Sequence, residues 1–338
     1  MALDAFRGFV MVVLVSNGFG LPALANHPTY AWIARQFNHV AWEGAVFWDL
    51  IMPAFLFVAG AAMPFALAKR ERPFGHVAAR SIRLLLLSQI LICISGNKLQ
   101  FQIVNVLAQL ALTYFCTYLI LRLRFGAQVV TAVLLLAGHS ALFYLFPGPD
   151  GPFSKMGNIG AVIDRWWLGG NYSGYYTTLN FLSSIPSTLF GAWAARLIMS
   201  PRNVAEKLKI LAGSTLVAFA SGLALTVWVP CVKRLWTASF AVYSTGWVLV
   251  MLIVFFWVFD MRGWRKPAFP LVVVGMNSIF IYSINQVLQG WINRSLAVFT
   301  GKFEWLGTPA PIFQSLAVLL VMWYLCYWLY QRKIFLKL

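Results

Sequence analysis

The chain is poor in charge, and poorest in negative charge. Of its 338 residues only 10% are Asp, Glu, Lys or Arg, and Asp and Glu together number 9. A soluble globular domain carries about 25% charged residues, so the composition excludes a water-soluble fold. The chain has few cysteines: Cys93, Cys116, Cys231 and Cys326. Their scattered positions predict neither a metal site nor a disulfide framework.

Apolar residues dominate instead. The sequence is 61% hydrophobic and 16% aromatic, with a mean hydropathy of +0.76. Its net charge of +17 would suggest nucleic-acid binding in a soluble chain. Here the basic residues lie at the ends of apolar segments, a pattern typical of membrane topology. We therefore expect an all-α polytopic protein in a lipid bilayer, with no nucleic-acid partner.

A helix of about 20 mostly apolar residues crosses a bilayer, and the sequence predicts about ten such transmembrane helices. They cover residues 6–25, 44–68, 82–96, 103–121, 126–146, 180–199, 209–229, 237–259, 268–289 and 311–330. No repeat, low-complexity tract or soluble domain interrupts the chain. We expect a single transmembrane domain over residues 1–338.

The basic residues predict the orientation of the chain. An even number of spans puts both termini on one side of the membrane. With the termini in the cytoplasm, most of the 26 Lys and Arg residues face inward, as the positive-inside rule requires. Among them are Lys69, Arg70, Arg72 and Lys337. We expect both termini to be cytoplasmic.

Polar residues recur within three predicted spans at separations of three or four, so each set lies on one helical face. The sets are Ser278, Tyr282, Asn285 and Gln289; Asn105, Gln109, Thr113 and Cys116; and Asn180, Ser184 and Ser187. Together they indicate a hydrated central cavity or tunnel. The alternative is hydrogen bonding between helices, at about 0.6 kcal/mol per pair.

Ionisable residues inside or beside the spans are candidates for function, because charge is costly in a bilayer. Asp49 lies in the second span and needs a partner or water, although a structural ion pair would also explain it. Asp4 and Arg7 can form an i,i+3 pair, or Arg7 can bind a phosphate. His39 precedes the second span, where it can face both the outer compartment and the cavity.

Short motifs in a fixed order connect these residues. They are Leu3-Asp4-Ala5-Phe6-Arg7-Gly8, His39-x2-Trp42-x-Gly44-x4-Asp49-Leu50-x2-Pro53-x-Phe55-Leu56-Phe57-x2-Gly60, Ile163-Asp164-Arg165 with Leu168-Gly169, Lys233-Arg234-Leu235-Trp236-Thr237, Gly275-Met276-Asn277-Ser278-Ile279 and Arg332-Lys333-Ile334-Phe335. Together they resemble the heparan-α-glucosaminide N-acetyltransferase family of transmembrane acyltransferases, over residues 3–335.

The resemblance implies an enzyme that transfers an acetyl group from cytoplasmic acetyl-CoA to an amino sugar on the far side of the membrane. It aligns His39 with the family's active-site histidine, and it suggests a homodimer. A histidine with a pKa of about 6.5 can accept the amine proton near neutral pH. It can also carry the acyl group, and the sequence leaves both routes open. Asn17 and Asn277 are our candidates for stabilising the oxyanion. A thioester donor requires neither ATP nor a metal, and we expect no metal ion.

The phosphates of coenzyme A should lie at the basic inner rim. We expect Asp4, Arg7, Arg80, Arg83 and Ser278 there, with the arginines as phosphate clamps. Arg80 and Arg83 can also serve membrane topology alone.

Asp49 is our further catalytic candidate. If the second helix begins near Ala41, Asp49 lies about 12 Å along it, at roughly 1.5 Å per residue. That is too far to orient His39 directly unless the outer loop folds inward, so we assign Asp49 to the cavity wall.

The acceptor side departs from the family pattern. Val106-Leu107-Ala108-Gln109 lacks an arginine that the family often has, and Thr177-Thr178-Leu179-Asn180 replaces an acidic segment. A hydroxyl acceptor on an envelope glycan therefore competes with an amine. The residues that we expect to bind the acceptor are Trp42, Glu43, Trp166, Asn180 and Asn285. Trp166 and its aromatic neighbours can stack on sugar rings or form an interfacial belt.

The sequence thus predicts a membrane acyltransferase, and its compact loops favour a bacterial inner (cytoplasmic) membrane. One alternative is a glycan or lipid transporter, for which internal pseudo-repeats would be expected and none is visible. The other is a catalytically inactive binding or assembly protein.

Overall fold

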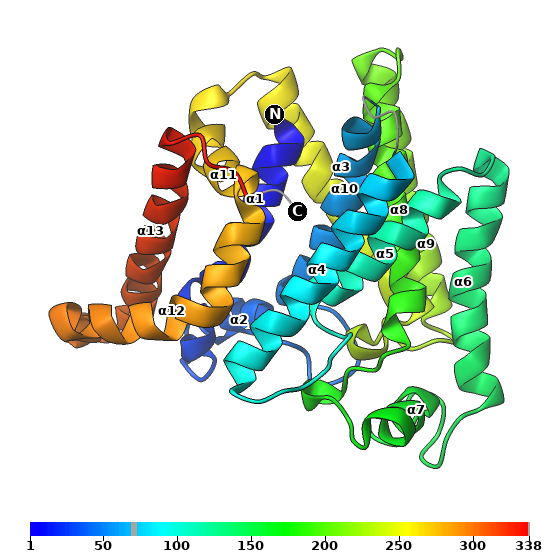
Figure 1. Cartoon of the computed structure of the whole chain (residues 1–338), viewed down its shortest axis with the longest axis horizontal. Coiled ribbons are helices and arrows are strands. Elements are labelled where there is room, and N and C mark those ends of the chain that lie inside the picture. Colours follow the sequence, from blue (N-terminus) through cyan, green and yellow to red (C-terminus); the bar gives the residue numbers. More distant parts are fainter. Residues whose placement is uncertain (69–72, 337–338) are drawn as a thin grey trace.

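The computed structural model describes residues 1–68 and 73–336. Four basic residues of the predicted inner side, Lys69, Arg70, Arg72 and Lys337, lie outside this range. Within it the chain is helical and contains no strand, apart from an isolated bridge between Gly44 and Val232. Most of the helices run side by side between two ends of the molecule (Figure 1).

The long helices correspond to the predicted spans. They are α1 (Ala2–Val15), α3 (Ile51–Leu67), α4 (Pro73–Gly96), α5 (Val106–Ile120), α6 (Phe125–Leu145), α8 (Asn180–Met199), α9 (Val204–Leu225), α10 (Ala238–Phe255), α11 (Arg265–Met276), α12 (Ser278–Thr300) and α13 (Ala310–Gln331). By length and composition, 7 helical segments of the described chain can cross a membrane, or up to 8 if the bent pair α11–α12 is one span.

Three of the ten predicted spans are not, as single helices, both long enough and apolar enough to cross a membrane. Helix α5 has only 15 residues. Helix α8 is long enough, but it carries many buried polar residues and is absent from the qualifying set. The span predicted at 268–289 is broken at Asn277, where α11 and α12 meet at a bend of 68°. The all-α membrane architecture is confirmed, whereas the count of ten stays a prediction.

Glycines allow the central helices to pack closely. A side chain at Gly60 of α3 would overlap the backbone oxygen of Thr188 on α8, and one at Gly191 would overlap that of Phe57. Small residues at such contacts are typical of helix packing in membranes. The α3–α8 pair forms the middle of the bundle, and Leu56 is fully buried there.

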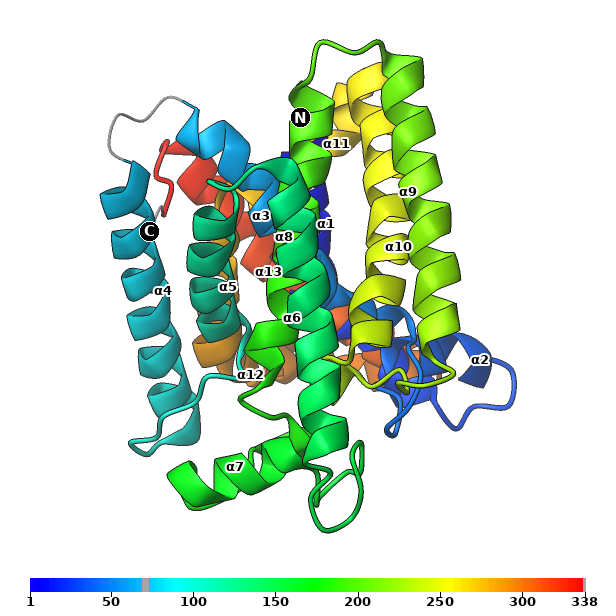
Figure 2. The ribbon, with the colours of Figure 1, turned by 90° about the vertical axis from the view of Figure 1, so that its right-hand side faces the viewer.

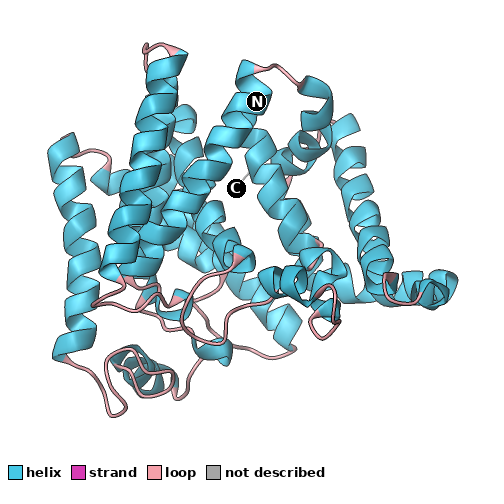
Figure 3. Ribbon diagram, turned by 180° about the vertical axis from the view of Figure 1, so that it is seen from behind, coloured by secondary structure: helices cyan, strands magenta, loops and turns pink. Residues whose placement is uncertain are grey.

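The two ends of the bundle differ. One end carries short connections such as the α8–α9 loop, at the top of Figure 2. The opposite end gathers long irregular segments (Figure 3). They include η1 (Gly18–Leu24), α2 (Ala31–Ala34), η2 (Arg35–Phe37), η3 (Phe47–Leu50), α7 (Ile159–Leu168) and η5 (Lys233–Leu235).

The start of α1 and the end of α13 both lie in the upper half of the molecule in Figures 1 and 2. The backbone N–H of Ala2 donates to Asp260 Oδ1 at 3.1 Å, after the end of α10. That both ends face the cytoplasm stays a prediction.

Candidate active site

The chain between η2 and η3 folds back toward the helix that follows it. Asn38 and Val46 are extended, and α3 begins only at Ile51. Gly44 has a φ of +103°, a backbone conformation that residues other than glycine rarely adopt. Its N–H donates a hydrogen bond to Cys231 O at 2.7 Å. This long-range contact fixes the loop against the segment before η5.

As a result, His39 and Asp49 are in direct contact. His39 Nδ1 lies 2.6 Å from Asp49 Oδ1. The His39 side chain is 39% exposed, whereas that of Asp49 is 1% exposed. No helix begins at Ala41, so the assignment of Asp49 to the cavity wall is wrong. The outer loop folds inward instead, which is the condition under which the sequence analysis allowed Asp49 to orient His39.

Lys233, the first residue of η5, completes the cluster. Its Nζ lies 3.3 Å from Asp49 Oδ1 and 3.3 Å from His39 Nδ1. Burial lowers the pKa of Lys233 to about 8, although the charge of Asp49 acts in the opposite direction. The sequence analysis gave Lys233 no role, although it lies in one of the motifs that carry the resemblance.

The contacts of Asp49 decide which nitrogen of His39 carries the proton. Its second oxygen lies 3.3 Å from the N–H of Val46 and 3.5 Å from that of Val40. An ionised carboxylate only accepts hydrogen bonds, so the 2.6 Å contact requires the proton on Nδ1. The neutral imidazole then has its lone pair on Nε2, for which no hydrogen bond is found in the described parts of the chain.

Further contacts hold the loop and η5 together. Arg234 donates from its guanidinium to Ala41 O at 2.9 Å. Asn180 donates to Arg234 O at 2.6 Å and accepts from Thr177 Oγ1 at 2.9 Å. Since these bonds occupy the fully buried side chain of Asn180, its expected contact with substrate is not supported. Asn180 instead anchors the segment that carries Lys233.

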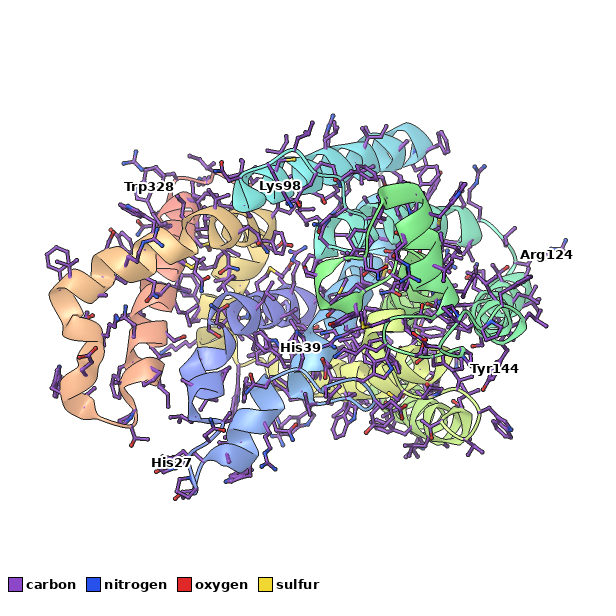
Figure 4. The ribbon with its side chains drawn as sticks, turned by 90° about the horizontal axis from the view of Figure 1, so that it is seen from below. His27, His39, Lys98, Arg124, Tyr144 and Trp328 are labelled. Carbon is purple, nitrogen blue, oxygen red and sulfur yellow. The ribbon has the colours of Figure 1, made fainter. Side chains whose placement is uncertain are left out.

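Trp42, Glu43 and Trp166, which were also predicted to bind the acceptor, are spread over this end of the molecule. His39 lies near the middle of the face seen in Figure 4, and His27 lies at its edge. Trp42 donates from its ring to Phe153 O at 2.9 Å. Glu43 is exposed on the same loop as His39, and Trp166 is 86% exposed on α7.

The two predicted oxyanion donors are not brought to His39. Asn17 follows α1 and lines a separate cavity of about 430 Å³ with Gln289 and Lys302. Asn277 donates to Ile334 O at 3.2 Å and accepts from Leu336 N at 3.2 Å. Within residues 1–68 and 73–336, neither asparagine contacts His39, so the structure does not support the oxyanion role.

The predicted ion pair between Asp4 and Arg7 is confirmed, with Nη2 and Oδ1 2.6 Å apart. Arg80 lies near Arg7; its guanidinium carbon is 4.7 Å from the centre of the Tyr114 ring, and its Nη1 donates to the Tyr114 hydroxyl at 3.3 Å. The Nε atoms of both arginines are buried and have no partner in the described structure. Such donors suit an anionic ligand.

Arg83 is exposed on α4, and no contact places it with Arg7 and Arg80. Ser278 is the first residue of α12 and is half-buried.

Two of the predicted polar stripes contain buried acceptors. The amide oxygens of Gln109 on α5 and Asn285 on α12 are buried without a partner among the described residues. Buried polar atoms are normally paired. These atoms therefore fit the predicted polar interior, in which water or a bound molecule would satisfy them. No group of three or more His, Cys, Asp and Glu that could hold a metal ion is found in the described chain.

Comparison with known proteins finds a distant similarity. No protein-family model matches the chain. It is 22% identical to human heparan-α-glucosaminide N-acetyltransferase, over 100% of this chain and 59% of the human protein. It is also 22% identical to the mouse protein of that name, over 99% of this chain and 60% of the relative. The chain thus spans about three-fifths of the length of these curated relatives. This distant similarity suggests a membrane acetyltransferase.

Proposed function

We propose that the protein is a membrane acyltransferase that moves an acetyl group from cytoplasmic acetyl-CoA to the amine of a glucosamine-like sugar on the outer side. The observation that carries the proposal is the contact between the half-exposed His39 and the buried Asp49. It gives His39 an oriented ring with a free basic nitrogen at the end where the long loops gather. The similarity to acetyltransferases along the whole chain agrees with this chemistry.

In the reaction, the amine nitrogen of the sugar attacks the thioester carbonyl carbon. The new C–N bond forms as the C–S bond breaks. His39 Nε2 accepts the proton that the amine loses and returns it to the leaving sulfur, so the products are an N-acetyl sugar and the thiol of coenzyme A. Asp49 stabilises the imidazolium formed in between. In the alternative route, His39 Nε2 attacks the thioester carbon as the C–S bond breaks, which gives an acyl-histidine and the thiolate of coenzyme A. The sugar amine then attacks the acyl-histidine, the bond to Nε2 breaks as the new C–N bond forms, and the proton that the amine loses goes to the thiolate.

Lys233 has a supporting role in this mechanism. A buried carboxylate without a cation is strongly destabilising, and the ammonium 3.3 Å away supplies that cation. The charge of Asp49 is therefore balanced before His39 takes up a proton.

Coenzyme A would bind at Arg7 and Arg80. Their unpartnered Nε donors and the positive charge that remains beside the Asp4–Arg7 pair suit phosphate groups, and the pantetheine arm would extend toward His39. In this arrangement the donor enters from the end opposite the long loops.

Transfer to a sugar hydroxyl is a second candidate. The observation that favours it is the Thr177–Asn180 segment, which has no acidic residue and whose Asn180 side chain is occupied by protein contacts. No acid of that segment can therefore hold a cationic sugar. Glu43, exposed on the same loop as His39, is the acidic residue that would favour an amine.

The test compares His39→Ala with wild type in nanodiscs, using radiolabelled acetyl-CoA and either glucosamine or glucose. His27→Ala is the matched control, since His27 is also an outer-loop histidine but lies at the edge of the face. We expect label on glucosamine with wild type and His27→Ala, and a loss of at least about 100-fold with His39→Ala. Transfer by His39→Ala at the wild-type rate would refute the role of His39. Label on glucose alone would establish the second candidate.

A further inference from the structure

A large apolar cavity shares no lining residue with the His39 cluster. It has a volume of about 870 Å³ and is bounded by α6, α8, α9 and α10, where α6 stands apart from the α9–α10 pair in Figure 2. Ligand sites in proteins commonly enclose about 300–1,000 Å³. Most of its lining is aliphatic or aromatic, including Val133, Leu136, Phe190, Val217 and Leu249.

One end of this cavity is positively charged. Arg196, Ser200 and Arg202 line it at the α8–α9 connection. The guanidinium of Arg196 donates to Leu121 O at 3.2 Å, which leaves its other N–H groups available. Arg202 is exposed, and its side chain has no partner in the described structure.

A second cavity of about 460 Å³ shares Arg196 and Ser200 and adds Arg122. Three arginines therefore line these two neighbouring cavities. None of the residues that line either cavity is acidic, so an anion at the shared rim would meet no opposing charge.

The depth of the apolar cavity matches one leaflet of a membrane. On α9 its lining runs from Ile210 to Ser221, and on α6 from Phe125 to Leu136. Each interval spans roughly 16 Å at about 1.5 Å per residue, which is about half of a hydrocarbon core about 30 Å thick. The arginines lie at the helix ends, where headgroups would be.

Helix α6 has few protein neighbours along its length. Only 22% of the residues in the most apolar stretch of Phe125–Leu145 are buried. An empty gap beside this helix would forfeit dispersion contacts along its inner face. Water is a poor occupant, because the walls offer few polar partners.

We propose that this cavity binds one anionic phospholipid from the leaflet at the α8–α9 end. The phosphate lies between Arg196 and Arg202, and an acyl chain fills the space between α6 and α9. The charge of the rim selects the headgroup, because arginines near a membrane surface attract anionic lipids, whereas the apolar walls accept any acyl chain. This proposal does not depend on the proposed enzymatic function.

The test is lipid retention measured by native mass spectrometry after detergent purification. The probes are dioleoyl phosphatidylglycerol, which is anionic, and dioleoyl phosphatidylcholine, which is neutral overall. We expect one phosphatidylglycerol per chain, retained at least about tenfold more strongly than phosphatidylcholine. Equal retention of the two lipids would overturn the proposal.

Three variants separate the headgroup site from the acyl site. Arg196→Gln with Arg202→Gln should weaken phosphatidylglycerol retention about fivefold per arginine, whereas Arg124→Gln, just before α6 and outside the lining, should not. Ser214→Phe, which places a ring in the cavity, should reduce retention of both lipids. Unchanged retention in either the arginine pair or Ser214→Phe would refute the site. Recovery of a lipid-free dimer would show that a second copy covers this face instead.

Discussion

Replacing Asp49 with Asn changes one oxygen for an NH2 group and removes the charge, with little change of shape. In the native site, Oδ1 faces His39 and Lys233, and Oδ2 faces the N–H groups of Val40 and Val46. An amide has one acceptor and one donor side, so it cannot satisfy both pairs. If its oxygen stays toward the backbone, its NH2 faces His39 Nδ1. The ring then carries its proton on Nε2, where the reaction needs a lone pair.

The size of the effect follows from these contacts. General-base catalysis contributes about 10²- to 10⁴-fold, and a wrong histidine tautomer removes most of it. We therefore expect kcat of Asp49→Asn to fall by about 10²- to 10⁴-fold, or about 3–5 kcal/mol in barrier height. The variant also leaves the buried ammonium of Lys233 without its partner. Breaking a buried pair costs about 3–5 kcal/mol, so the melting temperature should fall too.

A double variant separates the loss of catalysis from the loss of stability. Asp49→Asn with Lys233→Met removes the stranded charge, and we expect it to regain part of the lost melting temperature while its kcat stays low. The assay is the initial rate of acetyl transfer at saturating acetyl-CoA, together with thermal unfolding in the same detergent. A folded Asp49→Asn enzyme within about threefold of the wild-type rate would refute the proposed orientation of His39.

Two further predictions concern charge. Because burial lowers the pKa of Lys233 to about 8, its ammonium is present below that pH and is lost as the pH rises through it; we expect kcat/KM to decline above about pH 8. Lys233→Arg keeps its charge, since the pKa of arginine exceeds about 12, and should extend activity to higher pH. If kcat/KM of wild type and Lys233→Arg declined at the same alkaline pH, the result would contradict this role of Lys233. Arg80→Gln should raise the KM for acetyl-CoA by about tenfold or more, with a smaller change in kcat. Arg83→Gln, at an exposed position on the same helix, should not raise it. Equal KM values for the two variants would argue against the proposed coenzyme A site.

The predicted spans show what hydropathy detects and what it misses. Segments that face lipid, such as α6 and α13, are apolar all round and were predicted nearly to their ends. Helix α8 lies in the interior and buries Asn180, Ser183, Ser184 and Ser187. The sequence analysis predicted this span with the bounds of the helix, 180–199, but α8 does not qualify as a span by its composition, because its neighbours are other helices that satisfy its polar groups. The break at Asn277 depends on a bond to the C-terminal segment, which no local window contains.

The sequence identified two residues of the cluster around His39, but not the long-range contacts that bring the cluster together. The sequence identified His39 and Asp49, because ionisable groups beside or inside an apolar span are candidates by themselves. Their contact depends on the inward fold of the loop, which is set by Gly44 and its bond to Cys231 nearly 190 residues later. Helical spacing could not reveal that contact. Charge balance could have revealed Lys233: a carboxylate buried in a span requires a cation, and the Lys233-Arg234 pair is the basic part of a motif that had no other assigned role. Asking which cation must accompany each buried acid therefore recovers a long-range contact that periodicity does not encode.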